Sequence, residues 1–199
     1  MLDQVMDEQA VLKLVYNRIA GGQNVALIAS RRNDATNLLR TIGQPQVYSQ
    51  WLPDAQNWVF AYLASEQVDT CRESADLWQL IWRTLAAQAI QQPWYAHLDP
   101  LTTAPTMKAD RALWLIAEQQ GKLVLFFDRM DDLAKKPEIW TMELLGPLRS
   151  WSSRYSSFNI VFSSNQPLSE LNRLQGGYGS PLFNTFTAIS LDELESTEV

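Results

Sequence analysis

The sequence predicts an α/β fold, in which a mostly parallel five-stranded sheet lies between two layers of helices as a three-layer sandwich. Two observations predict it. Short apolar runs alternate along the chain with longer segments of helical periodicity. The runs are almost continuously apolar, as in parallel strands that helices cover on both faces. The 199 residues suffice for one such core, so we assign residues 1–199 to a single domain.

The first elements are a helix, a strand and a second helix. Apolar spacing predicts a helix over residues 3–20, which Gly21 and Gly22 are expected to end. The apolar run 25–29 predicts the first strand. A polar loop is expected over 30–34, before a helix that contains Leu38, Leu39 and Ile42.

The middle of the chain continues the alternation. Aromatic and β-branched residues over 57–63 predict the second strand. Helical spacing of leucine, isoleucine and tryptophan predicts a long helix over 73–91. A proline-containing loop follows, and then a helix over about 107–120 that Gly121 ends.

The last third contains the most apolar strand. This run, 123–127, ends abruptly in Asp128. A helix is expected over 137–155, and Gly146-Pro147 within it predicts a kink or a split into two helices. The remaining elements are expected to be a strand at 158–162, a short helix at 168–174, a glycine loop at 176–179 and a strand at 186–191.

Composition limits the function classes. The net charge of -6 disfavours nonspecific binding to nucleic acid or to anionic membranes. A single cysteine, Cys71, allows no internal disulfide, and a single histidine, His97, allows no multi-histidine metal site. No apolar run is long enough to span a bilayer, and the N-terminus lacks the pattern of a signal peptide. We therefore expect a cytoplasmic protein without a membrane partner.

Several segments of the chain, in this order, resemble those of a known family. They are the helix before the first strand, Arg31-Arg32, Leu38-Leu39-Arg40, the apolar strand ending in Asp128, Leu148-Arg149-Ser150-Trp151 and Ser180-Pro181-Leu182-Phe183-Asn184. Through them the chain resembles bacterial AAA-like domain proteins, which are P-loop ATPases of the AAA and signal-transduction type. The resemblance covers roughly residues 8–195, and another doubly wound α/β fold stays open as the alternative.

The phosphate-binding motif of this family is degenerate here. A working P-loop needs glycines, a lysine for the phosphates and a serine or threonine for Mg²⁺. If Arg31 and Arg32 match the basic pair of the family, its Gly-Lys-Thr positions fall on Asp34, Ala35 and Thr36, of which only Thr36 is retained. Asp34 would repel a phosphate, since two like charges ~4 Å apart at an effective dielectric of 20 repel by roughly 4 kcal/mol. The arginine pair is either an anion contact or, more commonly for such pairs, solvated.

The second half of the expected site is also altered. By resemblance, Asp128 takes the place of the Mg²⁺-associated acid and Asn165 that of the polar residue that senses the γ-phosphate. Arg129 stands where the family usually has a glutamate that activates water, and a guanidinium cannot act as a general base. Asp131 or Asp132 could replace that base. For Asp128, a salt bridge to Arg129, Arg31 or Arg32 is at least as plausible as metal binding.

These departures predict a catalytically inactive ATPase-like domain that acts as a protein-interaction or regulatory module, with no catalytic residues. The remnants of the nucleotide site are Arg31, Arg32, Thr36, Asp128 and Asn165. No cofactor is expected, although Thr36 and Asp128 would be the Mg²⁺ ligands if Mg-ATP bound. A protein partner or a homo-oligomer is expected, and nucleic acid is not. The alternative is a weak or partner-activated ATPase, as part of a mobile-element or defence machine. The resemblance also implies a helical lid after the last strand, which we expect this chain to lack because it stops at Val199.

Overall fold

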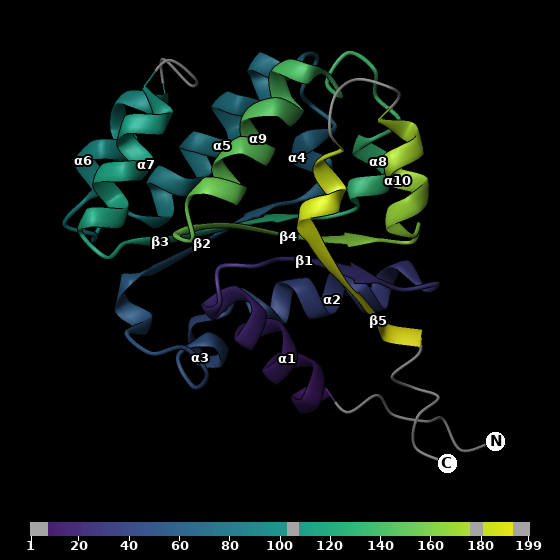
Figure 1. Ribbon diagram of the computed structural model, residues 1–199, viewed down its shortest axis with the longest axis horizontal. Coiled ribbons are helices and arrows are strands. Elements are labelled where there is room, and N and C mark those ends of the chain that lie inside the picture. The colour runs from purple at the N-terminus through teal and green to yellow at the C-terminus, as the bar shows by residue number, and fades with distance from the viewer. Residues whose placement is uncertain (1–7, 103–107, 176–180, 193–199) are drawn as a thin grey trace.

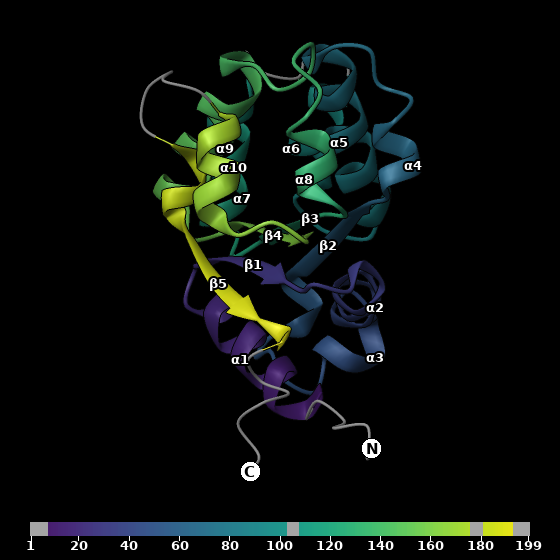
Figure 2. The ribbon, with the colours of Figure 1, turned by 90° about the vertical axis from the view of Figure 1, so that its right-hand side faces the viewer.

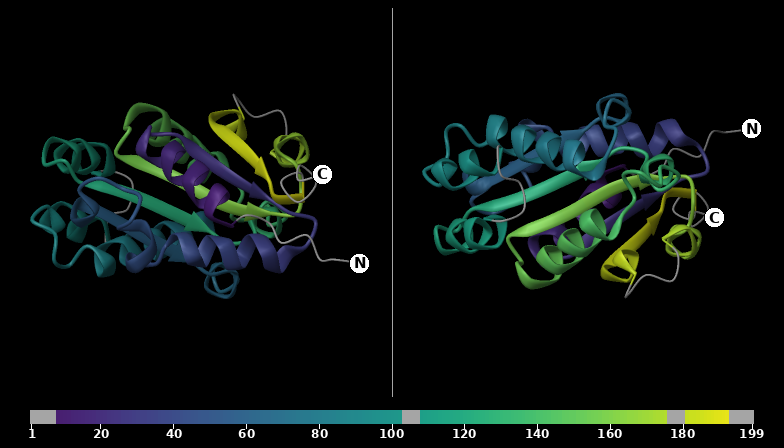
Figure 3. Two further views of the ribbon diagram at one scale, coloured as in Figure 1. Left: turned by 90° about the horizontal axis from the view of Figure 1, so that it is seen from below. Right: turned by 90° about the horizontal axis from the view of Figure 1, so that it is seen from above.

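A five-stranded sheet runs through the middle of the molecule. The computed structural model describes residues 8–102, 108–175 and 181–192. All neighbouring strands are parallel and lie in the order β2-β3-β4-β1-β5, and their arrows point to the same end in Figure 3. The predicted parallel sheet is therefore confirmed. Its strands are β1 (Asn24–Ile28), β2 (Trp58–Leu63), β3 (Lys122–Phe127), β4 (Phe158–Ser164) and β5 (Phe186–Ser190).

Helices cover both faces of the sheet, as the three-layer prediction requires (Figure 1). One face carries α1 (Glu8–Ala20), α2 (Arg32–Ile42) and α3 (Pro45–Tyr48). The longer helices of the other face are α5 (Ser74–Gln88), α7 (Ala109–Glu118), α9 (Met142–Arg154) and α10 (Leu168–Leu174). Short segments on that face are α4 (Ser65–Val68), α6 (Tyr95–Leu98), α8 (Met130–Leu133) and the 3-10 turns η2 (Asp99–Thr102) and η3 (Leu182–Thr185). Figure 2 shows the two helical layers from the side.

The sheet separates two hydrophobic cores. Every residue of β4 is buried, and successive side chains point to opposite faces. Ile160 therefore packs in the core beneath α5 and α9, while Val161 packs in the core beneath α1 and α2. The continuous apolar runs of the sequence have this origin, because both sides of each central strand face helices.

The helix α9 differs from the prediction. It begins at Met142 rather than near residue 137, and it continues through Pro147 as one helix instead of two. Proline has no N–H, so the carbonyl of Glu143 loses its usual helical donor. The indole Nε1 of Trp78 on α5 donates to that carbonyl over 3.2 Å. A neighbouring helix thus supplies the missing hydrogen bond, and of the two outcomes predicted from Gly146-Pro147, a kink or a split, the split does not occur.

The predicted end of the first helix is confirmed. The helix stops at Ala20, and Gly22 has a φ of 72°, a left-handed conformation that glycine adopts without strain. A Cβ at Gly22 would also lie only 2.8 Å from the Cβ of Ser156. The glycine loop predicted at 176–179 lies outside the described residues. No helix in the described part of the chain is long and apolar enough to cross a membrane.

The fold brings the ends of four strands to one edge. Because β2, β3, β4 and β1 are parallel neighbours, the residues that follow or end them lie side by side. The register pairs Leu63 with Phe127, and Phe127 with Phe162. This edge is where ligands bind in open parallel sheets, and it contains the candidate site.

Candidate functional site

Asp128 lies at the centre of this edge. It follows β3 directly and is only 4% exposed. Its Oδ1 accepts two hydrogen bonds of 2.7 Å, one from the hydroxyl of Thr36 on α2 and one from that of Ser163 on β4. Three elements that are distant in sequence are therefore joined through one carboxylate oxygen.

The second oxygen of Asp128 is also occupied. The phenol of Tyr62, on β2, donates to Oδ2 over 2.8 Å. The same phenol accepts a hydrogen bond of 3.1 Å from Nε of Arg40, whose guanidinium lies 5.7 Å from the centre of the Tyr62 ring. Burial, and then the hydrogen bond to Asp128, raise the pKa of Tyr62 to about 12, so the phenol remains a donor at neutral pH.

Arg129 holds Ser163 in place through its backbone. Its φ of 54° is left-handed, an unusual conformation for a residue with a side chain. In this conformation the N–H of Arg129 donates to the hydroxyl oxygen of Ser163 over 2.8 Å, and that hydroxyl in turn donates to Asp128. The position expected to hold a catalytic glutamate therefore contributes a backbone contact that orients a serine.

The loop between β1 and α2 is shorter than predicted. β1 ends at Ile28 and α2 begins at Arg32, so that only residues 29–31 connect them. A P-loop motif ending at Thr36 would span residues 29–36, yet residues 32–36 are helical here. Ala35, at the lysine position, is buried and has no cation to offer. The predicted loop over residues 30–34 is thus wrong for its last three residues.

A carboxylate of the chain itself occupies the start of this loop. Both the N–H and the hydroxyl of Ser30 donate to Asp192, with distances of 3.0 Å to Oδ2 and 3.1 Å to Oδ1 respectively. Asp192 comes just after β5, the strand that pairs with β1. The backbone donor that follows β1, where a P-loop begins to wrap a phosphate, therefore binds an internal anion.

The site residues predicted from sequence separate into two groups. Thr36 and Asp128 are hydrogen-bonded to each other, whereas Arg31 is exposed and the side chain of Arg32 lies outside the described part of the chain. Asp128 accepts from hydroxyls and forms no salt bridge with the described side chains of Arg31 and Arg129, while the pairing suggested with Arg32 stays a prediction.

Asn165 makes no contact with Asp128, and the γ-phosphate-sensing role that the resemblance implied for it stays a prediction. From β4 it is Ser163, two residues earlier, that reaches Asp128. The Oδ1 atom of Asn165 is buried and has no partner among the described residues.

The candidate replacement bases are engaged elsewhere. Asp131, on α8, is buried, and the amine of Lys135 lies 3.7 Å from its carboxylate. The same amine lies 3.0 Å from Asp132. Both carboxylates therefore share a lysine next to α8, an arrangement typical of a structural ion pair.

Three contributors were missed by sequence reasoning, namely Tyr62, Ser163 and Asp192. Tyr62 looks like an ordinary aromatic of a buried strand, and Asp192 looks like part of a solvated acidic end. Ser163 could have been predicted from the sequence, because it belongs to a polar cluster at the end of a strand next to β3.

The residues present do not fit Mg-ATP. Mg²⁺ requires oxygen ligands in an octahedron at about 2.0–2.1 Å, and in P-loop proteins a lysine shares the phosphate charge. Thr36 and Asp128 alone would be suitable ligands. However, both oxygens of Asp128 already accept protein hydroxyls, and no lysine stands at the required position.

Comparisons with known proteins support the fold. No known family model matches the sequence, and no curated protein matches it. The chain is similar to a solved structure of Drosophila ORC bound to AT-rich DNA and Cdc6, with a TM-score of 0.60 and 12% identity over 96% of this chain and 31% of that one. It is also similar to the ORC2 protein of Aeropyrum pernix in ADPNP-ADP complexes, with a TM-score of 0.57 and 12% identity over 92% of this chain and 46% of that one.

These similarities concern the fold. The chain spans less than half the length of either structure. Together with the all-parallel five-stranded sheet, they show that this chain has an AAA-like fold of the P-loop ATPase type.

Proposed function

We propose that this chain is a catalytically inactive ATPase-like domain that acts as a protein-interaction or regulatory module. The observation that carries the proposal is the environment of Asp128. The hydroxyls of Thr36, Ser163 and Tyr62 satisfy both of its oxygens. A Mg²⁺ ion would have to compete for the carboxylate with these buried donors, each of which contributes about 1.5–3 kcal/mol as a hydrogen bond to a charged group.

The loop after β1 supports the same conclusion. Its short length leaves little backbone to surround a phosphate, and the carboxylate of Asp192 already accepts from Ser30. Ala35 cannot neutralise phosphate charge, and Asp34 adds a negative charge in the first turn of α2. In this proposal the P-loop remnants have become structural connections between α2, the sheet and the segment after β5.

A role in an assembly is supported by analogy. The Drosophila ORC structure contains Cdc6 and DNA, so a domain of this fold there belongs to a multi-component complex. We propose a protein partner, or a second copy, for the present chain. We do not extend the DNA contact to it, because its net charge of -6 opposes the phosphate backbone.

The alternative is a weak or partner-activated ATPase. One observation favours it, namely that Thr36 and Asp128 lie together at the carboxyl edge of the sheet, as Mg²⁺ ligands would.

Steady-state turnover separates the two functions. Phosphate release from Mg-ATP is measured for the purified chain and for the Asp128→Ala variant. The proposal predicts that both rates equal that of the heat-inactivated protein. A rate above this blank that Asp128→Ala abolishes would establish the alternative, and the assay is repeated with any partner that is identified.

A further inference from the structure

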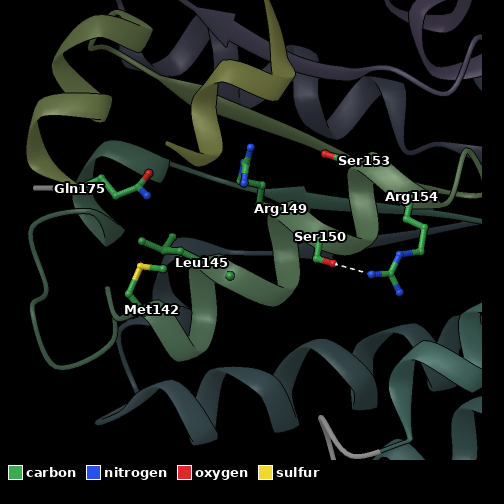
Figure 4. A pocket seen from close by; sticks show the side chains of 8 residues that line it. Met142, Leu145, Arg149, Ser150, Ser153, Arg154 and Gln175 are labelled. Carbon is green, nitrogen blue, oxygen red and sulfur yellow. Dashed lines mark hydrogen bonds between the residues drawn. The ribbon is translucent and has the colours of Figure 1, made fainter. Parts of the chain in front are cut away.

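A groove runs along α9 on the helical face opposite α1 and α2. One part is a hollow of about 380 Å³ lined by residues that include Gly146, Arg149, Ser150 and Ser153 (Figure 4). The other part, of about 770 Å³, is lined by residues that include Pro137, Trp140 and Leu174. The two hollows share Met142, Leu145 and Gln175, and we call the continuous depression the α9 groove.

One half of the α9 groove is apolar and open to solvent. Met142 and Leu174 are 45% and 41% exposed, although both are large hydrophobic residues. Leu145 and Trp140 form a buried floor beneath them. The backbone is also accessible, because a Cβ placed on Gly146 would meet no atom within 4 Å. Exposed apolar side chains around such a hollow are typical of an interaction site.

The other half contains an unpaired arginine. Arg149 projects from α9 in Figure 4 and makes no hydrogen bond or ion pair with any residue that the structure describes; its Nε is buried without a partner. Its neighbour Arg154, by contrast, is satisfied by Asp110 at 2.6 Å and by Ser150 at 3.3 Å. A half-buried guanidinium without an acceptor is unfavourable, and an incoming carboxylate would supply the two oxygens that match it.

We propose that the α9 groove docks an acidic amphipathic segment of a protein partner. Its apolar side chains would lie on Met142 and Leu174, and a carboxylate would pair with Arg149. Charge complementarity selects this occupant. The chain as a whole has a net charge of -6, but the groove presents the guanidinium of Arg149 without an acceptor among the described residues. Lys135 and Arg154 also line the groove, but they are already paired with aspartates. The inference rests on the proposed interaction function and identifies the surface that performs it.

Fluorescence anisotropy with defined peptides tests the proposal. The probe is a fluorescein-labelled peptide of sequence GLDELLEELG, titrated with the full chain at low salt. A charge-reversed peptide, GLKKLLKKLG, and a peptide without leucines, GSDESSEESG, serve as comparisons. We expect binding of the first peptide with a Kd on the order of 10–100 µM, and at least about tenfold weaker binding of the other two.

Variants locate the binding. Arg149→Gln and Leu174→Ser are each expected to weaken it about tenfold, and salt is expected to weaken it in the wild type more than in Arg149→Gln. Lys13→Gln, which removes one positive charge from the exposed surface of α1, is the matched control and should bind like the wild type. Unchanged melting temperatures establish that the variants fold.

Two results would overturn the docking site. One is the absence of binding up to millimolar protein, and the other is equal loss of binding in Lys13→Gln and Arg149→Gln. Neither result affects the proposal of an inactive ATPase-like domain, which depends on turnover. Conversely, measurable ATP turnover would leave peptide binding at the α9 groove unaffected.

Discussion

The phenol of Tyr62 donates a hydrogen bond of 2.8 Å to Oδ2 of Asp128, the acid that ends β3. Tyr62 lies near the end of β2, the edge strand that pairs with β3. The contact places an uncharged donor where a metal-binding acid would need a free oxygen. With Thr36 and Ser163 on the other oxygen, Asp128 becomes a junction between one helix and three strands.

Removing the Tyr62 hydroxyl should lower the stability of the fold. Tyr62→Phe keeps the ring and deletes the donor to Asp128, so we expect the free energy of unfolding to fall by about 1–2 kcal/mol. Urea unfolding followed by tryptophan fluorescence measures this loss. Tyr48→Phe is the matched control, because the Tyr48 ring stacks on Phe60 and its hydroxyl makes no hydrogen bond with the residues that the structure describes. Equal effects in the two variants would argue against the junction.

The same phenol should make stability sensitive to alkaline pH. The pKa of Tyr62 is raised from 10.0 to about 12 in the folded chain, so the unfolded chain releases this proton first. The protonated Tyr62 therefore makes its full contribution to the free energy of unfolding below about pH 10, and this contribution is lost as the pH rises towards 12. Burial also raises the pKa values of Tyr16 and Tyr48. The free energy of unfolding of the wild type therefore falls at alkaline pH because several tyrosines lose their protons.

The urea midpoint, measured at intervals from about pH 8 to pH 11, isolates the part due to Tyr62. We expect the midpoint of Tyr62→Phe to decline less steeply than that of the wild type. Parallel curves would show that Tyr62 does not titrate differently in the folded state.

Ser30 and Asp192 should be energetically coupled. If the carboxylate of Asp192 binds the Ser30 hydroxyl as well as its N–H, then Ser30→Ala and Asp192→Asn should not be additive. We expect a coupling energy of about 0.5–1 kcal/mol in a double-mutant cycle, measured by chemical unfolding at low salt. Additive losses would mean that the hydroxyl contact contributes nothing to stability.

The helix α9 offers a further double-mutant test. Trp78→Phe removes the indole donor to the carbonyl of Glu143 and should destabilise the chain by about 1–3 kcal/mol. Pro147→Ala restores an N–H that can donate to the same carbonyl within the helix. Trp78→Phe should therefore cost less in the Pro147→Ala background. An identical cost in both backgrounds, by calorimetry, would indicate that only the lost ring packing matters.

The sheet was predictable because its signal is local. Runs such as 123–127 are continuously apolar, since both faces of β3 are covered, and this pattern is visible without knowledge of the partners. The position of Asp128 followed in the same way, as the first polar residue after the most apolar strand. Its proximity to Thr36 was implied by the family resemblance.

The contacts that define the site were not predictable from local patterns. Tyr62 and Asp128 are 66 residues apart, and Ser30 and Asp192 are 162 apart, so their meeting depends on the order of strands in the sheet. The start of α2 at Arg32 was not predicted from the sequence for another reason. Asn33 and Asp34 favour loops, yet an acidic residue in the first turn also stabilises a helix through its dipole.

The most direct test of the account is nucleotide binding at equilibrium. The purified chain is titrated with ATP and with ADP in a calorimeter, each with and without Mg²⁺, and Thr36→Ala is titrated alongside. Because Asp128 is satisfied by protein hydroxyls and the lysine position holds Ala35, we predict no binding heat up to millimolar nucleotide. Micromolar binding that requires Mg²⁺ and is lost in Thr36→Ala would contradict the account, since it would show that Asp128 exchanges its hydroxyl partners for a metal ion.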